Sequence, residues 1–176
     1  EGPAGAARGL QAQLADHGEV VATIYFGDNY FHEHKDEALA AILAEVEKRR
    51  PEVVVAGPAF NAGRYGLACV EICQAASERL GVRCITGMEP ENPAVSSYRD
   101  AHNEKVFLFP TAETAAGMTA ALKLIAPLAC RLALNEEIGP AAAEGYVSRG
   151  IRRLTRVDRA AVGRAIDMLL KKVVGE

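Results

Sequence analysis

Apolar and polar positions along the chain follow two different periods. Short runs of β-branched and aromatic residues predict buried strands at 19–26, 53–57, 82–86 and 105–109. Most of the stretches around these runs carry an apolar residue every three to four positions, and we predict helices over 3–15, 35–49, 66–80, 111–134 and 158–173. Strands and helices therefore alternate, an order typical of a parallel sheet with helices on both faces.

Local signals support several of these helices. Glu45 and Arg49 can pair one turn apart on the helix that contains them. Pro127 falls inside the long fourth helix and should kink it. Asp158 is suited to cap the last helix, because its carboxylate can accept hydrogen bonds from first-turn N–H groups.

We predict an α/β fold with three layers and a mostly parallel four-stranded sheet. A flavodoxin-like or Rossmann-like sheet with strand order 2-1-3-4 fits the alternation best. Residues 1–134 form the α/β domain in this interpretation. Residues 135–176 form a C-terminal arm and helix that packs on the domain or on a partner. The irregular part of the arm is longer than a loop that only connects two elements.

The composition narrows the class of protein. The 176 residues suffice for one domain, and 49% apolar and 24% charged residues are ordinary for a globular chain. The net charge of −3 provides no basic field for nucleic acid, and no apolar run approaches the ~18 residues of a membrane span. A late basic cluster indicates a solvated or interface arm rather than an anion site; it comprises Arg149, Arg152, Arg153, Arg156 and Arg159.

All four cysteines, Cys69, Cys73, Cys84 and Cys130, lie in apolar surroundings. We predict reduced thiols in a cytoplasmic protein rather than a disulfide framework. Cys69 and Cys73 are one turn apart on a predicted helix, where they serve best as small core residues. A stand-alone thiol enzyme that uses one of them is a weaker alternative.

Ligands of open parallel sheets bind beyond the carboxyl ends of the strands. The segments that follow the four predicted strands are rich in glycine and polar residues, and they span 27–34, 57–66, 87–93 and 110–114. We expect these four loops to converge and to form the site.

The second loop, within AGPAFNAGRYGLAC, carries the strongest candidates, Asn61, Arg64 and Tyr65. An arginine near a helix start can bind a carboxylate or phosphate bidentately, and the N-terminal N–H groups of the helix add donors. In the alternative, Arg64 pairs with Glu89 or Glu91 and only joins two loops. The loop-shaping glycines Gly57, Gly63, Gly66 and Gly87 do not match the dinucleotide-binding spacing, and no Walker lysine is present.

His32 and His34 flank Glu33 in the first loop. Such a pair can bind a metal, but no further ligand pattern accompanies it. Surface or helix-entry histidines are the preferred interpretation, so we predict no metal site and keep both residues as weak candidates.

The strings AGPAFNAGRYGLAC, EICQA and TGMEPENPAV resemble a specific family, and the resemblance continues through ETAAGM, EEIGPAAAEGY, RGIRR and RAIDMLL. The chain resembles the N-terminal part of the selenoprotein B subunit of the glycine/sarcosine/betaine reductases, which is related to D-proline reductase. Besides the glycines and the three candidates above, the matching residues include Pro58, Glu91, Asn92 and Pro93.

The resemblance implies a subunit of an enzyme that reductively cleaves the C–N bond of a small amino acid or its N-methyl derivative. A partner subunit with a pyruvoyl group activates the substrate, and a selenocysteine or cysteine attacks its α-carbon. On this basis Arg64 would hold the substrate carboxylate, and Asn61 and Tyr65 would orient it. Glu91 or Asp28 would engage the amine or position a proton, and Asn92 is a further substrate-binding candidate.

The printed residues include no selenocysteine motif and no pyruvoyl-forming cysteine, so we expect no cofactor on this chain. Three explanations for the missing catalytic groups are open. The chain is a fragment of a longer protein, it is one of two polypeptides that together make the subunit, or it is a diverged protein that only binds. A non-catalytic scaffold subunit of a heteromeric complex is the alternative function. We expect partner chains, a hetero- or homo-oligomer, and neither nucleic acid nor membrane as partner.

Overall fold

Three parallel strands form the centre of the fold: β1 (Val53–Phe60), β2 (Arg83–Met88) and β3 (Val106–Pro110). The structure is a computed structural model that describes residues 2–151 and 161–175. The strands lie in the order β1-β2-β3, and β1 pairs with β2 directly. The predicted strands over 53–57, 82–86 and 105–109 are therefore confirmed. The predicted order 2-1-3-4 is wrong, because it placed another strand between β1 and β2.

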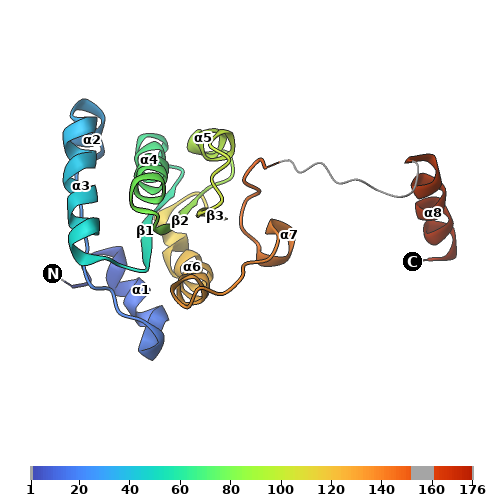
Figure 1. Cartoon of the computed structure of the whole chain (residues 1–176), viewed down its shortest axis with the longest axis horizontal. Helices are drawn as coiled ribbons and strands as arrows, with labels where there is room; N and C mark the ends of the chain where they lie inside the picture. Colours follow the sequence, from blue (N-terminus) through green and yellow to red (C-terminus); the bar gives the residue numbers. More distant parts are fainter. Residues whose placement is uncertain (1, 152–160, 176) are drawn as a thin grey trace.

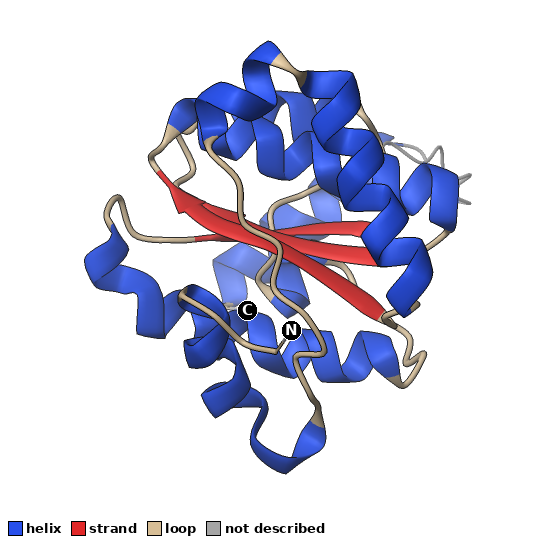
Figure 2. Ribbon diagram, turned by 90° about the vertical axis from the view of Figure 1, so that its left-hand side faces the viewer, coloured by secondary structure: helices blue, strands red, loops and turns tan. Residues whose placement is uncertain are grey.

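Helices cover both faces of the sheet, which confirms the predicted three-layer α/β arrangement (Figures 1 and 2). One face carries α2 (Asp28–Glu33), α3 (Lys35–Arg49), α4 (Gly63–Leu80) and α5 (Ala94–Asp100). The other face carries α1 (Ala6–Leu14) and α6 (Met118–Ala133). Because neighbouring strand residues point to opposite faces, Val106 and Leu108 pack under the first layer and Phe107 under the second.

The remaining elements are short or lie near the C-terminus. They are the 3₁₀ turns η1 (Ala15–His17) and η2 (Ala115–Gly117), and the helices α7 (Ala141–Glu144) and α8 (Ala161–Val174). The predicted helix over 35–49 is confirmed to the residue, with Arg49 Nε 3.2 Å from Glu45 Oε2. Helix α6 contains Pro127 as predicted but starts seven residues later than predicted, because η2 and a turn precede it. The proposed cap at Asp158 lies outside the described residues.

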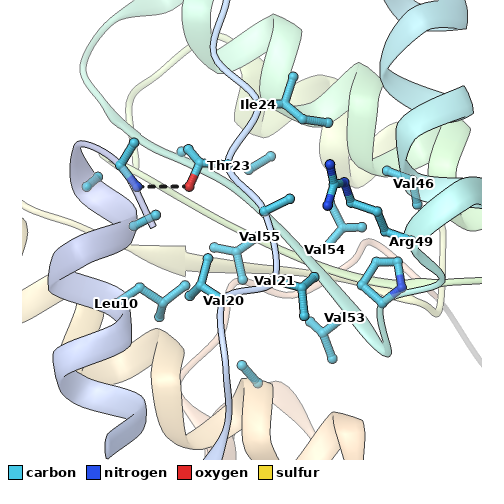
Figure 3. A pocket seen from close by; sticks show the side chains of 18 of the residues that line it. Leu10, Val20, Val21, Thr23, Ile24, Val46, Arg49, Val53, Val54 and Val55 are labelled. Atoms are coloured by element: carbon cyan, nitrogen blue, oxygen red, sulfur yellow. Dashed lines mark hydrogen bonds between the residues drawn. The ribbon is translucent and has the colours of Figure 1, made fainter. Parts of the chain in front are cut away.

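The predicted strand over 19–26 is not a strand in the structure, so the prediction of a fourth strand is not confirmed. The segment crosses β1 (Figure 3), and hydrogen bonds to side chains, rather than to the sheet, hold it in place. Val20 N donates to Gln11 Oε1 at 2.7 Å, and Ala4 N donates to Thr23 Oγ1 at 3.0 Å. A largely apolar groove of about 650 Å³ lies between this segment and β1.

Hydrogen exchange should distinguish the observed open segment from a fourth strand. Residues 21–26 make no backbone–backbone hydrogen bond within the described part of the chain, whereas Cys84 N, at the centre of the sheet, bonds to Lys105 O at 2.9 Å. We therefore expect the amides of 21–26 to exchange at least about 100-fold faster than those of β2. Equal protection of both segments would restore the predicted fourth strand.

The arm that follows α6 packs on the domain along the outer edge of β3. Val147 N donates to Leu108 O at 2.7 Å, and Tyr98 Oη donates to Val147 O at 2.8 Å. The guanidinium of Arg149 lies 4.9 Å from the centre of the Phe107 ring. Arg149 is thus part of the packing. The other members of the late basic cluster lie outside the described residues.

Residues 115–133 form the one helix in the described ranges that is long and apolar enough to cross a membrane by length and composition. Its apolar residues are concentrated on one side. Leu122, Ile125 and Leu132 are buried in the layer under the sheet, whereas Leu124 is 49% exposed. One buried face against a sheet is the arrangement of a core helix.

Candidate functional site

Polar loops meet at the carboxyl ends of the three strands, and backbone hydrogen bonds join them. Asn61 N, after β1, donates to Glu113 O at 3.1 Å. Glu89 N, after β2, donates to Phe60 O at 3.0 Å, and Thr111 N donates to Met88 O at 2.9 Å. The expected convergence of the segments 57–66, 87–93 and 110–114 is therefore confirmed.

The first predicted loop also reaches this edge, although no strand precedes it. Asp28 begins α2, and its Oδ2 lies 3.9 Å from Arg64 Nε at the start of α4. This distance is at the long end of an ion pair, and both side chains are substantially exposed. Helix packing, rather than strand pairing, thus places Asp28 beside Arg64.

Arg64 occupies the first turn of α4, which begins at Gly63, three residues before the predicted helix start. Its side chain is 62% exposed and faces Asp28. In the described part of the chain it forms no ion pair with Glu89 or Glu91, which was the purely structural alternative. Among the described residues, no side chain caps the N-terminus of α4, so the guanidinium and the first-turn N–H groups together present donors to an anion.

Asn92 lies beneath the loops rather than on their surface. Its Nδ2 donates to Phe60 O at 3.0 Å, and its Oδ1 accepts a hydrogen bond from Ala94 N at 3.0 Å. A Cβ at Gly66 would stand 2.7 Å from Asn92 Oδ1, so this close approach requires glycine there. Asn92 clamps the end of β1 to the loop after β2, and a direct contact of Asn92 with substrate stays a prediction.

The other loop-shaping glycines have separate roles. Gly57 has φ +93°, a conformation that L side chains rarely adopt, and it turns the chain near the end of β1. A Cβ at Gly87 would stand 3.0 Å from Thr111 Cγ2, and one at Gly63 would stand 3.4 Å from Pro93 Cγ. Gly87 is thus the tighter of these two positions, and only Gly57 has the predicted turn-forming backbone.

Tyr65 and Cys69 lie one turn apart on α4, and their side chains interact. Burial raises the pKa of the Tyr65 phenol, and burial also raises the pKa of the Cys69 thiol to about 12. Both groups are therefore neutral at physiological pH. The Tyr65 side chain interacts with the Cys69 thiol, and a neutral buried thiol is a poor nucleophile. This argues against the stand-alone thiol enzyme and favours Cys69 as a core residue.

The groove beside β1 approaches this site but does not contain it. Phe26, Gly57, Tyr65 and Cys69 are among its lining residues, and the segment 19–26 and β1 contribute many of the others (Figure 3). Arg64, Asn61 and Asp28 lie outside the groove. The candidate anion site is thus an open surface between loops.

The two histidines do not join the site. His32 and His34 are exposed, and the His34 ring lies 4.8 Å from that of Tyr30. The described residues contain no group of three or more side chains that could hold a metal. Glu91 is exposed on the loop after β2, and its N–H donates to Glu89 Oε2 at 2.7 Å.

Sequence reasoning located the loops but missed the groups that tie them together. These are the backbone carbonyls of Phe60, Met88 and Glu113, for which no residue type is a signal. It also missed Thr86, whose Oγ1 is buried without a hydrogen-bond partner in the part of the chain that the structure describes. The sequence did contain a signal for Thr86, because it is a polar residue inside an otherwise apolar predicted strand.

A three-layer α/β domain with donor-rich loops at the carboxyl ends of its strands has the architecture of a ligand-binding domain. The family model "Glycine/sarcosine/betaine reductase selenoprotein B" matches residues 1–176. The chain belongs to this family, as the sequence resemblance predicted.

Curated relatives carry names from the same group of enzymes. The chain is 43% identical over 176 residues to the glycine reductase complex component B subunit gamma of Carboxydothermus hydrogenoformans, covering 100% of this chain and 40% of that protein. It is 42% identical to the sarcosine reductase complex component B subunit beta of Peptoclostridium acidaminophilum, covering 100% of this chain and 39% of that protein. For the betaine reductase complex component B subunit beta of the same organism, the identity is 38% and the coverage 99% and 39%. The chain thus spans about two fifths of these relatives, and no solved structure matches it.

Proposed function

We propose that this chain forms the substrate-binding part of a component B subunit in a reductase complex that cleaves the C–N bond of a small amino acid or N-methylated amino acid. Three curated relatives are named for glycine, sarcosine and betaine reductase complexes. Glycine, sarcosine and betaine all carry a carboxylate and differ in the methylation of nitrogen. A binding site common to the three must therefore recognise the carboxylate.

The observation that carries the proposal is the convergence of the loops at the carboxyl ends of the strands, where Arg64 is exposed at the start of α4. In this proposal, the carboxylate binds the Arg64 guanidinium and the N–H groups at the start of α4, while Asn61 and Tyr65 orient it. Asp28, beside Arg64, or Glu91 lies against the ammonium group. Betaine has no N–H to donate, so a carboxylate side chain would attract it through charge alone.

The reacting groups come from elsewhere in this proposal. A selenocysteine or cysteine outside these 176 residues attacks the substrate carbon, and a pyruvoyl group on a partner chain activates the amine. Burial keeps the thiols of Cys69 and Cys73 protonated, since it raises the pKa of Cys69, and contact with Cys84 together with burial raises that of Cys73. A reducing cytoplasm suits an oxygen-sensitive selenol, and an oligomeric complex suits the separation of these groups.

Replacement of Arg64 by alanine tests the carboxylate site. We expect the variant to bind glycine, sarcosine or betaine more weakly by about 1–3 kcal/mol in calorimetric titrations, because a charge-assisted hydrogen bond is lost. Arg64→Lys should retain part of the affinity. Arg79→Ala, an exposed change in the last turn of the same helix, is the matched control and should bind like the parent.

Unchanged affinity in a folded Arg64→Ala variant would remove the carboxylate role. A second outcome is that the unmutated chain binds none of the three compounds. That result would favour the alternative of a non-catalytic scaffold subunit, whose loops serve only to join elements of the domain.

A further inference from the structure

Helix α8 (Ala161–Val174) carries an apolar stripe that the described residues leave uncovered. Val162, Ile166, Leu169 and Val173 follow one another at intervals of three or four residues, which places them on one face of the helix. Their exposed fractions range from 51% for Ile166 to 82% for Val173. Figure 1 shows α8 apart from the layers of the domain.

A helix of this kind needs a surface to pack on. It has 14 residues, and a helix of that length is marginal in water without tertiary packing. A contiguous apolar stripe bordered by charged residues is typical of an interaction surface. The charged side chains of the helix, Arg164, Asp167, Lys171 and Lys172, lie off the stripe.

A second copy of α8 is a poor occupant of this stripe. The helix has only 14 residues, so a pair of copies would bury four stripe side chains from each partner. That area is well below the ~1,200 Å² of a stable interface.

The length of the relatives supplies another occupant. The chain matches 40% of the Carboxydothermus subunit, so about three fifths of that protein lies outside the match. We propose that the apolar stripe of α8 packs against this remaining part of the subunit and fixes it to the α/β domain. The proposal rests on family membership and does not depend on the carboxylate role of Arg64.

Hydrogen exchange on two proteins tests the proposal. One is the 176-residue chain, and the other is a full-length chimera in which this chain replaces the matching stretch of the Carboxydothermus subunit. We expect the α8 amides to be protected about 100-fold more strongly in the chimera than in the short chain. The β2 amides serve as an internal reference, because they should be equally protected in both.

Paired variants assign the protection to the stripe. In the chimera, Ile166→Glu with Leu169→Glu should abolish the added protection, whereas Arg164→Gln with Lys172→Gln on the charged side should retain it. The natural Carboxydothermus subunit, measured at the stretch aligned with 161–174, provides a second test that requires no chimera.

Three outcomes would overturn the proposal. The first is equal exchange of α8 in the short chain and in the long proteins. The second is protection in the short chain that rises with protein concentration, which would assign the stripe to a second copy. The third is protection in the short chain that appears only with anionic phosphatidylserine vesicles, which would assign it to a membrane surface.

Discussion

Replacement of Asn92 by aspartate is expected to destabilise the domain by about 3 kcal/mol at neutral pH. Asn92 is 2% exposed, and its Nδ2 donates to Phe60 O. The substitution puts a carboxylate oxygen opposite that carbonyl, so a donor is lost and a buried charge gains no compensating partner. The contact of the Asn92 side chain with Ala94 N can persist, because a carboxylate accepts hydrogen bonds.

The effect of Asn92→Asp should depend on pH in a definite direction. Burial raises the pKa of the new carboxyl group in the folded state above about 3.9, its value in the unfolded chain. The penalty is therefore full above the folded-state pKa, shrinks as the pH falls through it, and is smallest below the unfolded-state value. Urea unfolding of parent and variant at pH 7 and pH 5 measures the change.

Asn61→Asp is the control, because it makes the same chemical change on the exposed part of the same loop system. It should alter the free energy of unfolding by less than about 0.5 kcal/mol. If Asn92→Asp proved as mild as the control at both pH values, the clamp between the loops would be absent.

Much of the layered architecture was predictable, since it follows from periodicity. The buried runs around Val55, Ile85 and Phe107 became strands, and the amphipathic stretch over 35–49 became α3. Both signals are local, and each element has to bury an apolar face. Strand order is not local, because it depends on which edges meet. The direct pairing of Val55 with Ile85 could therefore not be derived from the chain.

The segment 19–26 shows where local preference fails. Its β-branched residues favour an extended conformation, and the segment is extended, but a strand also requires a partner at backbone distance. Gln11 and Thr23 instead provide side-chain hydrogen bonds that hold the segment beside the N-terminal residues. Polar side chains competing for backbone groups leave little trace in a hydrophobic pattern.

The location of the candidate site could be predicted from the sequence, but the contacts of its side chains could be predicted only in part. Parallel strands bring their carboxyl ends to one edge, so Asn61, Arg64 and Glu91 could be assigned to neighbouring loops. The same reasoning treated Asn92 as a ligand residue, which stays a prediction, and it did not foresee the hydrogen bonds of this side chain to the backbone. An asparagine in a loop serves equally well for binding or for clamping, and only burial and partners distinguish the two.

Replacement of Ile125 by alanine should destabilise the domain by about 2–5 kcal/mol, because it leaves a cavity under the sheet. Ile125 is 0% exposed in the apolar layer between α6 and the strands. The adjacent Leu124 is 49% exposed, so Leu124→Ala removes an aliphatic side chain of the same size from the same helix with little loss of packing. The control should cost less than about 1 kcal/mol.

This pair also tests the position of α6 directly. A helix that packs on the sheet with one face must respond very differently at positions 124 and 125, whereas a helix surrounded by lipid would respond similarly at both. Chemical denaturation of the two variants, followed by circular dichroism, measures the difference. Equal losses at the two positions would contradict the placement of α6 as the core helix beneath β1, β2 and β3.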